Sequence, residues 1–445
     1  MFPSELVLDR SVRSGDLAAT DLPLFILKCE DRKAEGYADA DLKVYNQRLQ
    51  GMVIGVRLAS KPPAVSYLTI IGAELSGEIV AVEEAIIVIS IGFTCEGATP
   101  WSYLIYDAAA LSLRLIPPPK HPSWRYTLSS QVSLARPAHG SASDYALVHS
   151  GRLGARGEDA FFLWRPSSTS PPWSEFKKFS LLHRNGWSET SPPFSFSGQT
   201  YRVDHLQGVF CYSCDAFFDD KSSSVLRFTP LPVEPRDFDE RKAEPDAYRT
   251  MGVVRDSFIK FISINGIHEY AQLKDRTVTV WKLLDLGHDK LWEMEHEFSM
   301  EKLWGFEGFG DVPKDLTPMY PLLSTKDTNI VYLGLGYYRE TRIVRGPQPP
   351  EWDFLPYYPR YMLAVDMRNK IVRTSVKLEG NKPTCLVSCG FSRYLRKALV
   401  LPCDDEGVPI PKKKKKKKPR RDGEDVAKAP ISMNKKPRLE KPICC

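Results

Sequence analysis

The sequence has no hydrophobic run long enough to cross a membrane. Its longest nearly uninterrupted apolar stretch lies at about residues 85–93, whereas a membrane helix needs roughly 20 apolar residues. Glu5, Asp9, Arg10 and Arg13 interrupt the N-terminal stretch, so we expect no secretory signal there. These absences argue against membrane and exported proteins, and we expect a protein that stays inside the cell without contacting a membrane.

Cysteines are sparse, with nine in 445 residues and no dense framework. This usage is typical of free thiols in a reducing compartment, and we expect no disulfides. Cys211 and Cys214 form a C-x-x-C pair, and Cys385 and Cys389 come nearest to a second pair. A structural zinc site needs four ligands of matching spacing, but both pairs lie in apolar, strand-like segments where cysteine packs as a small hydrophobic residue. We predict core packing for these cysteines, no metal and no cofactor.

Catalytic motifs are also missing. The sequence contains no G-x-S-x-G, H-E-x-x-H, G-x-x-x-x-G-K or G-x-G-x-x-G. Glu293 and His296 are three residues apart, but on a strand they point to opposite faces and do not form a ligand pair. His268, His288 and His296 are interpreted as turn or core residues, since no nucleophile and base accompany them. We predict no catalytic residues and no enzyme; a pocket with contacting ionisable groups would favour the alternative, an enzyme with its site at a propeller channel mouth.

The body of the chain has almost no net charge. Residues 404–445 hold 14 Lys+Arg and 7 Asp+Glu of the 61 and 55 in the whole chain, which leaves residues 1–403 at −1. The body therefore has no net electrostatic attraction for phosphate.

Short apolar segments rich in Val, Ile, Tyr, Phe and Trp, bounded by turn residues, are abundant and predict strands. One pattern recurs: an apolar strand ending near Asp, a polar turn and a second strand, at residues 101–117, 208–232 and 361–378. Because each unit is too small to bury its own apolar face, the repetition predicts an array of small antiparallel sheets. The predicted fold class is all-β and β-propeller-like, with roughly six to eight blades.

Residues 277–298 show the repeating unit most clearly, with Asp285, Gly287 and Asp289 as turn residues between two strands. In the second strand, alternation of period two predicts that Trp292, Met294, His296 and Phe298 face inward and that the intervening glutamates face solvent. Helical periodicity is scarce, and we predict one short helix at residues 39–49.

The C-terminal segment 404–445 has almost no aromatic or β-branched content and is predicted to be disordered, because it cannot bury enough surface to offset its ordering entropy. Two basic clusters, separated by a 13-residue gap and flanked by prolines, resemble the two-part signal that nuclear import receptors bind. The same lysines and arginines are suited to nonspecific nucleic-acid binding through counterion release. The predicted import residues are Lys412, Lys413, Lys414, Lys415, Lys416, Lys417, Lys418, Arg420, Arg421, Lys435, Lys436 and Arg438.

A string of short motifs follows in order along the middle of the chain. The motifs are Val203-Asp204, Gly208-Val209-Phe210-Cys211, Leu226-Arg227-Phe228, Pro230-Leu231-Pro232, Arg255 with Ile259-Lys260-Phe261, Thr279-Val280-Trp281, and Tyr320-Pro321 with Ser324, Asp327 and Val331-Tyr332. Between residues 202 and 330 the chain thereby resembles a large plant family, expanded in grasses, that carries the domain of unknown function 1618 (DUF1618). Residues 106–118 and 364–368 resemble the flanking repeats of full-length members. Arg202 departs from the family pattern, which usually has an aromatic residue there, and residues 212–219 are altered.

The resemblance implies a layout similar to the propeller domains attached to plant F-box proteins, and hence a protein-binding platform without known catalytic residues. Because no F-box-like helical start is present, a substrate-receptor-like role in a ubiquitin ligase is the weaker alternative. We divide the chain into a lead-in at 1–16, a propeller-like body at 17–403 with a family-like core at 202–335, and a tail at 404–445.

We therefore predict a non-enzymatic interaction protein in the nucleus, with the cytoplasm as the alternative location. Its expected partners are another protein and, through the tail, an import receptor. A nucleic-acid-associated protein held by the lysine-rich tail is the alternative from another class. Exposed aromatic residues would supply binding hot spots, although core packing is the usual role of Trp. The loop candidates are Trp124, Trp173, Trp187, Trp304 and Trp352.

Overall fold

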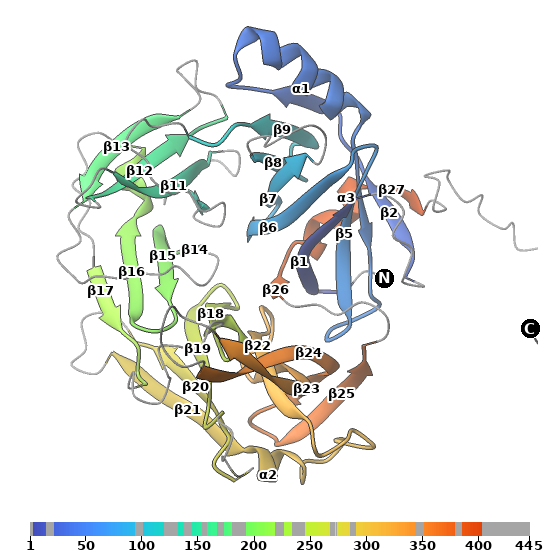
Figure 1. Cartoon of the computed structure of the whole chain (residues 1–445), viewed down its shortest axis with the longest axis vertical. Coiled ribbons are helices and arrows are strands. Elements are labelled where there is room, and N and C mark those ends of the chain that lie inside the picture. Colours follow the sequence, from blue (N-terminus) through green and yellow to red (C-terminus); the bar gives the residue numbers. More distant parts are fainter. Residues whose placement is uncertain are drawn as a thin grey trace, which may run out of the picture. The chain divides into compact units, whose positions relative to one another are not determined.

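The computed structural model describes residues 3–14, 22–93, 101–119, 132–137, 144–153, 158–166, 173–179, 193–218, 227–233, 245–267, 272, 274–284, 291–343, 351–378 and 385–402. The chain divides into two units, Met1–Pro409 and Ile410–Cys445, and all of the described residues belong to the first. The predicted disordered tail and all of the predicted import residues lie outside the described residues. Strands dominate what is described, and the all-β prediction is confirmed (Figure 1).

Four sheets each contain four strands that follow one another along the chain and pair antiparallel. This is the expected result when short apolar segments alternate with turn residues. The sheets consist of β10 (Val132–Ala135), β11 (Ala146–Leu153), β12 (Glu158–Trp164) and β13 (Ser174–Phe179); β14 (Phe194–Phe196), β15 (Gln199–Asp204), β16 (Gly208–Ser213) and β17 (Arg227–Pro230); β18 (Arg249–Val254), β19 (Phe258–Asn265), β20 (Thr277–Leu283) and β21 (Trp292–Ser299); and β22 (Thr317–Leu323), β23 (Ile330–Ile343), β24 (Glu351–Asp366) and β25 (Ile371–Lys377).

A fifth sheet has 11 strands in the order β27-β2-β4-β5-β1-β6-β7-β8-β9-β3, with β26 paired to β1. Residues 6–9 of β1 pair with β26, whereas Ser11 and Val12 pair with β6, so β1 joins two smaller sheets. The pairs β1–β5 and β3–β9 are parallel. The strands are β1 (Leu6–Ser14), β2 (Leu24–Leu27), β3 (Asp31–Ala34), β4 (Val53–Arg57), β5 (Val65–Ile71), β6 (Leu75–Glu83), β7 (Ile86–Phe93), β8 (Ser102–Asp107), β9 (Ser112–Ile116), β26 (Leu386–Cys389) and β27 (Leu399–Pro402).

Within the first unit, one strand from each small sheet contacts its counterpart in the next sheet. These strands, called the inner strands below, are β6, β10, β14, β18, β22 and β26, which touch in that order. Because β1 pairs with both β6 and β26, the circle of contacts closes. The sheets thus follow one another around a common centre (Figure 1). Six small sheets result, in agreement with the predicted propeller-like array.

The apolar core is divided among the interfaces between neighbouring sheets. One cluster contains residues of β10 to β12 together with residues of β6 to β9, and another contains residues from the sheets that begin at β14 and β18. Further clusters lie at the other junctions of the circle. A small sheet cannot bury its two faces alone, so each sheet depends on its neighbours. This is the physical reason that the sequence pattern repeats.

The three predicted strand–turn–strand copies are the third and fourth strands of three different sheets, β8–β9, β16–β17 and β24–β25. Asp107 and Asp366 end the third strand in two of them, and their carboxylates accept hydrogen bonds from the backbone N–H groups of the turn. In the copy at 208–232 the 3-10 helix η1 (Cys214–Phe217) follows the third strand instead. There Asp204, between β15 and β16, makes the equivalent turn contacts.

The predicted hairpin at residues 277–298 is confirmed as β20 and β21, but its predicted alternation is wrong in the middle. Val280 pairs with His296 and Trp281 with Met294, so Glu295 is an extra residue in β21, as in a β-bulge. The bulge leaves Met294 47% exposed and brings Glu295 to the buried ammonium of Lys260, which also donates to the Thr328 carbonyl at 2.8 Å.

Helices are few, and the predicted helix at 39–49 is confirmed as α1 (Asp39–Gly51). The others are α2 (Met300–Leu303), α3 (Ser392–Ala398), and the 3-10 helices η1 and η3 (Pro245–Ala247). None of the helices in the described ranges combines the length and apolar character needed to span a bilayer. The segment 1–16, interpreted as a lead-in, contains β1, which pairs with β5, β6 and β26 and is part of the body.

Candidate functional site

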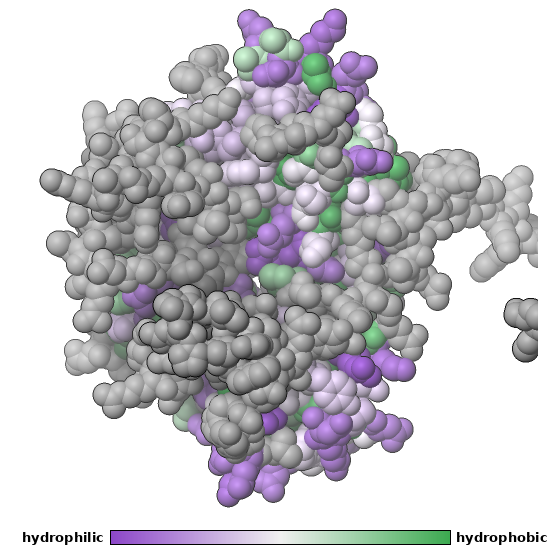
Figure 2. Space-filling view, viewed as in Figure 1, coloured by the Kyte–Doolittle hydropathy of each residue, from purple (hydrophilic) through white to green (hydrophobic). Residues whose placement is uncertain are grey.

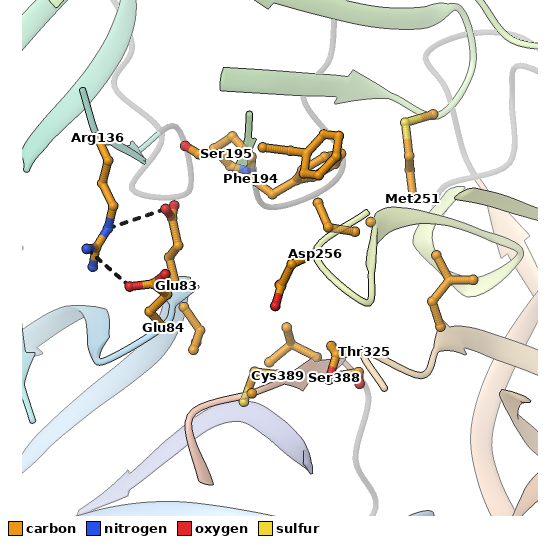
Figure 3. A pocket seen from close by; sticks show the side chains of 18 of the residues that line it. Glu83, Glu84, Arg136, Phe194, Ser195, Met251, Asp256, Thr325, Ser388 and Cys389 are labelled. Carbon is orange, nitrogen blue, oxygen red and sulfur yellow. Dashed lines mark ion pairs between the residues drawn. The ribbon is translucent and has the colours of Figure 1, made fainter. Parts of the chain in front are cut away.

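A cavity of about 460 Å³ lies where the inner strands end. Its walls come from β6, the residues after β10, β14, β18, β22, β26 and the start of α3 (Figure 3). We call it the end pocket. In the view of Figure 2, hydrophilic residues gather near the middle of the face, beside apolar ones. The volume lies within the roughly 300–1,000 Å³ that is usual for ligand sites.

Tight turns place polar side chains at this end. The inner strands β6, β14 and β18 each enter a short turn to the next strand of their sheet, and these turns contain residues with positive φ: Glu84 (49°), Ser197 (50°) and Arg255 and Asp256 (56° and 50°). Turns with positive φ match the twist of paired strands. Because the strands lie around one centre, turns that are far apart in the sequence meet at the same pocket.

Arg136, which follows β10, is the centre of an ion-pair network between two sheets. Its Nε lies 3.4 Å from Glu83 Oε1, and its Nη1 lies 3.2 Å from Glu84 Oε2 (Figure 3). The side chains of Arg136 and Glu83 are 15% and 20% exposed, whereas that of Glu84 is 53% exposed. Burial raises the pKa of Glu83 to about 7, although Arg136 and a hydrogen bond from Ser195 oppose the shift.

Asp256 contributes the most exposed carboxylate of the end pocket. It is 77% exposed, and its Oδ2 lies 3.3 Å from Nη2 of Arg393 in α3. In Figure 3 its carboxylate points toward the open space in front of Thr325 and Ser388. The Oγ atom of Ser388 is buried and has no hydrogen-bond partner among the residues that the structure describes. The pocket therefore holds an exposed acceptor opposite an unused hydroxyl.

The remaining wall is largely apolar. Phe194, Met251 and Leu322 line it, together with Cys389. Burial raises the pKa of the Cys389 thiol to about 12, so this cysteine is a neutral, packed side chain. Phe194 stacks on Tyr201 with a centroid separation of 5.3 Å, which fixes its ring. Rigid apolar surface thus adjoins the charged turns.

A buried carboxylate lies behind the pocket and connects it to the N-terminal strand region. Glu5 accepts hydrogen bonds from Ser324 Oγ at 2.7 Å, from the Thr325 N–H at 2.7 Å and hydroxyl at 2.9 Å, and from the Tyr332 hydroxyl at 2.5 Å. Thr325 itself lines the pocket. The contacts hold the β22–β23 turn in place, and the buried Glu5 carboxylate is fully supplied with donors.

A second, much smaller cavity of about 30 Å³ is lined by the first residues of β18 and β26 and by residues 320–322 of β22. Buried polar groups surround it. His205 Nδ1 lies 2.9 Å from Asp246 Oδ1, and Arg249 donates to the His205 carbonyl at 2.6 Å. Arg10 donates to the Ile79 carbonyl at 3.0 Å and to Cys385 Sγ at 3.0 Å. We call this the polar cluster; its volume is sufficient only for water or a small ion.

The two cysteine pairs lie in different parts of the circle. Cys211 belongs to β16 and Cys214 to η1, whereas Cys385 and Cys389 lie at β26. Burial raises the pKa of each of the four thiols. In the described ranges, no group of three His, Cys, Asp or Glu residues is placed to hold a metal ion.

The other candidates are dispersed. Glu293 is exposed on β21, and burial lowers the pKa of the half-buried His296. Trp173 is half-buried and donates to the Pro117 carbonyl at 2.7 Å, and Trp304 packs against the cluster between the sheets that begin at β18 and β22. His268, His288, Trp124, Trp187 and the side chain of Trp352 lie outside the described residues.

Sequence reasoning missed Glu83, Glu84, Arg136 and Asp256. The available signal was the charge within the short turns after the first strand of a sheet. That signal was insufficient, because only the closed circle of inner strands shows which turns meet at one end.

Residues 203–332 match the family model described as "Protein of unknown function (DUF1618)". No curated protein matches the chain. Among solved structures, the chain is similar to the α-L-arabinofuranosidase PaAbf62A from Podospora anserina, crystallised with cellotriose, at 9% identity, with 79% of this chain and 96% of that one covered and a TM-score of 0.27. It is also similar to PorZ, a surface component of the type-IX secretion system of Porphyromonas gingivalis, at 10% identity, 81% and 53% coverage and a TM-score of 0.15. The family match confirms the resemblance seen in the motifs: residues 203–332 match the domain that defines the DUF1618 family.

Proposed function

We propose that this chain is a non-enzymatic interaction protein whose propeller-like body binds another protein at the end pocket. One observation carries the proposal: turns from separate sheets converge on a cavity of about 460 Å³ that combines charged side chains with apolar wall. Binding hot spots of protein–protein interfaces pack into such pockets on the partner surface. A partner that inserts one or two side chains there would also touch the surrounding turns.

The ion pairs support a binding role. Arg136 joins Glu83 and Glu84, and Arg393 contacts Asp256, so the pocket's charged groups are held by contacts within the body. Groups fixed before binding lose little conformational entropy when a partner arrives. The pocket is thus prepared for a partner of defined shape and charge.

For the location, we propose the nucleus. The basic clusters from Lys412 to Arg421 and from Lys435 to Arg438 support recognition by an import receptor. Nonspecific nucleic-acid binding by the same residues is a separate hypothesis that a salt titration tests, because counterion release makes such binding strongly salt-dependent.

A steric variant tests the binding role. A Cβ atom built on Gly252, which lines the end pocket, meets only Leu323 Cδ1 at 3.9 Å, so the backbone accommodates the Cβ of Gly252→Phe, and its ring is added to occupy the pocket. Gly51, at the end of α1, has no atom within 4 Å of such a Cβ and gives the matched control Gly51→Phe. Proximity labelling of cells that express each full-length variant then reports the partners.

We expect Gly252→Phe to lose a specific set of labelled proteins that the unmodified chain and Gly51→Phe retain. Equal unfolding temperatures of the two variants would show that the loss is not caused by misfolding. If all three proteins label the same neighbours, the proposal that the end pocket binds a protein is wrong.

A second candidate function, acid–base hydrolysis, is favoured by one observation. Glu83 has a pKa of about 7 and shares Arg136 with Glu84, and a carboxyl group with a raised pKa beside a second carboxyl group is a pattern of general acid–base catalysis. Assays with chromogenic glycosides and esters decide between the two functions. We expect no turnover; turnover that Glu83→Gln abolishes would establish the enzyme instead.

A further inference from the structure

We propose that the end pocket binds the cationic side chain of an arginine or lysine in an extended segment of the partner protein. This inference rests on the proposed function and adds the chemistry of recognition. Three features carry it: the balance of charge in the lining, an unused buried hydroxyl, and an apolar wall suited to the stem of a long side chain.

The charges of the lining favour a cation. Glu83, Glu84 and Asp256 contribute three carboxyl groups, of which Glu83 is partly protonated near pH 7, whereas Arg136 and Arg393 contribute two guanidinium groups. Both guanidinium groups already contact these carboxylates. An incoming anion would have to displace an existing ion pair, but an incoming cation would add a partner to Glu84 and Asp256, which remain 53% and 77% exposed. Complementary charge then selects the partner and excludes acidic segments.

The second feature is Ser388. Its Oγ atom is buried in the pocket wall and has no hydrogen-bond partner in the described part of the chain. Buried hydroxyl groups are normally paired. In Figure 3 Ser388 lies beside Thr325, across the open space from the Asp256 carboxylate. A guanidinium or ammonium group in that space would donate to the Asp256 carboxylate, and a rotation of the Ser388 side chain, whose Oγ is buried in the wall, would let the hydroxyl accept a second hydrogen bond and complete the missing pairing.

The third feature is the apolar wall, which favours a long organic cation over a metal ion as the ligand. Phe194 and Met251 line the cavity beside the charged turns, and lysine and arginine bury their aliphatic stems along such surfaces. The described residues contain no cluster of three metal-ligating side chains. A cavity of about 460 Å³ is also far larger than a single ion requires. The occupant therefore has both a stem and a charged head.

The test uses the full-length protein and an array of immobilised nonapeptides. The central residue is Arg, Lys, Gln or Glu, and the flanking positions are varied. Peptides that bind are then made with a fluorescent label, and their Kd values are measured by anisotropy at fixed ionic strength. We expect peptides with a central Arg or Lys to bind at least tenfold more tightly than the same peptides with Gln, and those with Glu to bind least. The Arg and Lys arms show which of the two cations the pocket prefers.

Charge-neutral variants connect the preference to the pocket. The double variant Glu84→Gln with Asp256→Asn should weaken the best peptide at least tenfold and remove the preference for a cation. Glu293 and Glu297 are exposed on β21 outside the pocket lining, so the double variant Glu293→Gln with Glu297→Gln makes the same change in net charge and should leave the Kd unchanged. Ser388→Ala should cause a smaller loss.

The outcomes separate this inference from the proposed function. If peptides bind without a preference for Arg or Lys, and Gly252→Phe abolishes that binding, the inference is overturned but the proposed protein-binding function still holds. The inference also fails if the pocket and control double variants weaken binding equally, because the attraction would then come from overall charge. If no peptide binds, the inference is overturned, while partners lost by Gly252→Phe in cells would still support the platform.

Discussion

The two ends of the inner strands have opposite character. At the closed end, the first residues of β18 and β26 and residues 320–322 of β22 enclose about 30 Å³, and the polar cluster there includes Arg10 and Arg249, which are 5% and 1% exposed. At the open end, the end pocket, which shares Thr250, Leu322 and Leu386 with the smaller cavity, measures about 460 Å³, and Asp256 is 77% exposed there. Both ends carry charge, but only one gives a ligand access to it.

The difference shows how one scaffold separates stability from recognition. In the polar cluster, Arg10 has three different partners, namely Glu78 at 2.7 Å, the Ile79 carbonyl and the Cys385 thiol. A buried charge whose partner is lost is strongly destabilising. At the end pocket, Glu84 and Asp256 are exposed, and surface ion pairs contribute little to stability. Substitutions at the open end can therefore alter binding without unfolding the body.

The largest expected effect comes from the closed end. Arg10→Met would leave the Ile79 carbonyl and the Cys385 thiol without their donor, whereas Glu78, which is 44% exposed, would be hydrated. At about 1–3 kcal/mol for each buried group left unpaired, we expect the free energy of unfolding to fall by about 3–4 kcal/mol. Urea unfolding followed by fluorescence measures it. Arg368 is exposed and supplies the control Arg368→Met, which should change stability by less than about 0.5 kcal/mol. If the two variants lower the free energy of unfolding equally, the closed end does not contribute more to stability than an exposed surface position.

A smaller loss of stability is expected from Glu5, the buried carboxylate behind the end pocket. Glu5→Ala would leave the hydroxyl groups of Ser324 and Tyr332 without their acceptor, and buried unsatisfied groups cost about 1–3 kcal/mol each. We expect a total loss of roughly 3 kcal/mol because water can enter from the pocket and replace part of the pairing. Glu5→Gln keeps one carbonyl acceptor and should lose less. A stable Glu5→Ala protein would show that this carboxylate does not support the pocket.

The contrast between local and long-range contacts also explains which features of the fold could be predicted from the sequence. Period-two alternation and turn residues were sufficient to predict small antiparallel sheets, the hairpin of β20 and β21 and the helix α1, because these depend on neighbours in the chain. The exposure of Met294 was not predictable, because the bulge at Glu295 serves Lys260 in another strand of the sheet. Residues 1–16 lack a repeat of their own, and so the pairing of β1 with β26, across almost the whole chain, could not be seen.

The sites at both ends of the inner strands were also unpredictable, because their residues are far apart in the sequence. Glu83, Arg136 and Asp256 are ordinary turn residues in the sequence, and they become neighbours only when the circle closes. His205 and Asp246 have no sequence motif, yet they meet at 2.9 Å in the polar cluster.

The pH dependence of stability tests the burial of Glu83 at the open end. Its pKa is raised from 4.5 to about 7, chiefly by burial, so between these values the folded protein keeps a proton that the unfolded chain has lost. The free energy of unfolding therefore falls as the pH rises from about 4.5 to about 7, and no further change follows above that range. Glu83→Gln has no such proton.

Thermal unfolding of the two proteins at pH 5 and pH 8 measures the effect of Glu83. We expect the Tm of the unmodified protein to fall relative to Glu83→Gln by about 2 °C or more between the two pH values. Glu297→Gln, an exposed change on β21, should follow the unmodified protein. A Tm difference that is the same at both pH values would mean that the Glu83 carboxyl titrates as in the unfolded chain, and that the end pocket is wetter than its geometry implies.

The smallest effect on the body is expected from the tail. Replacing Lys412 to Lys418 with glutamine in the full-length chain should change the free energy of unfolding by less than about 0.5 kcal/mol, because a segment of this composition gains little by ordering. Peptide binding at the end pocket should also be unchanged, whereas the nuclear fraction of a fluorescent fusion should fall several-fold. A lost peptide affinity would instead make the tail part of the binding surface, and the open end would then no longer account for recognition on its own.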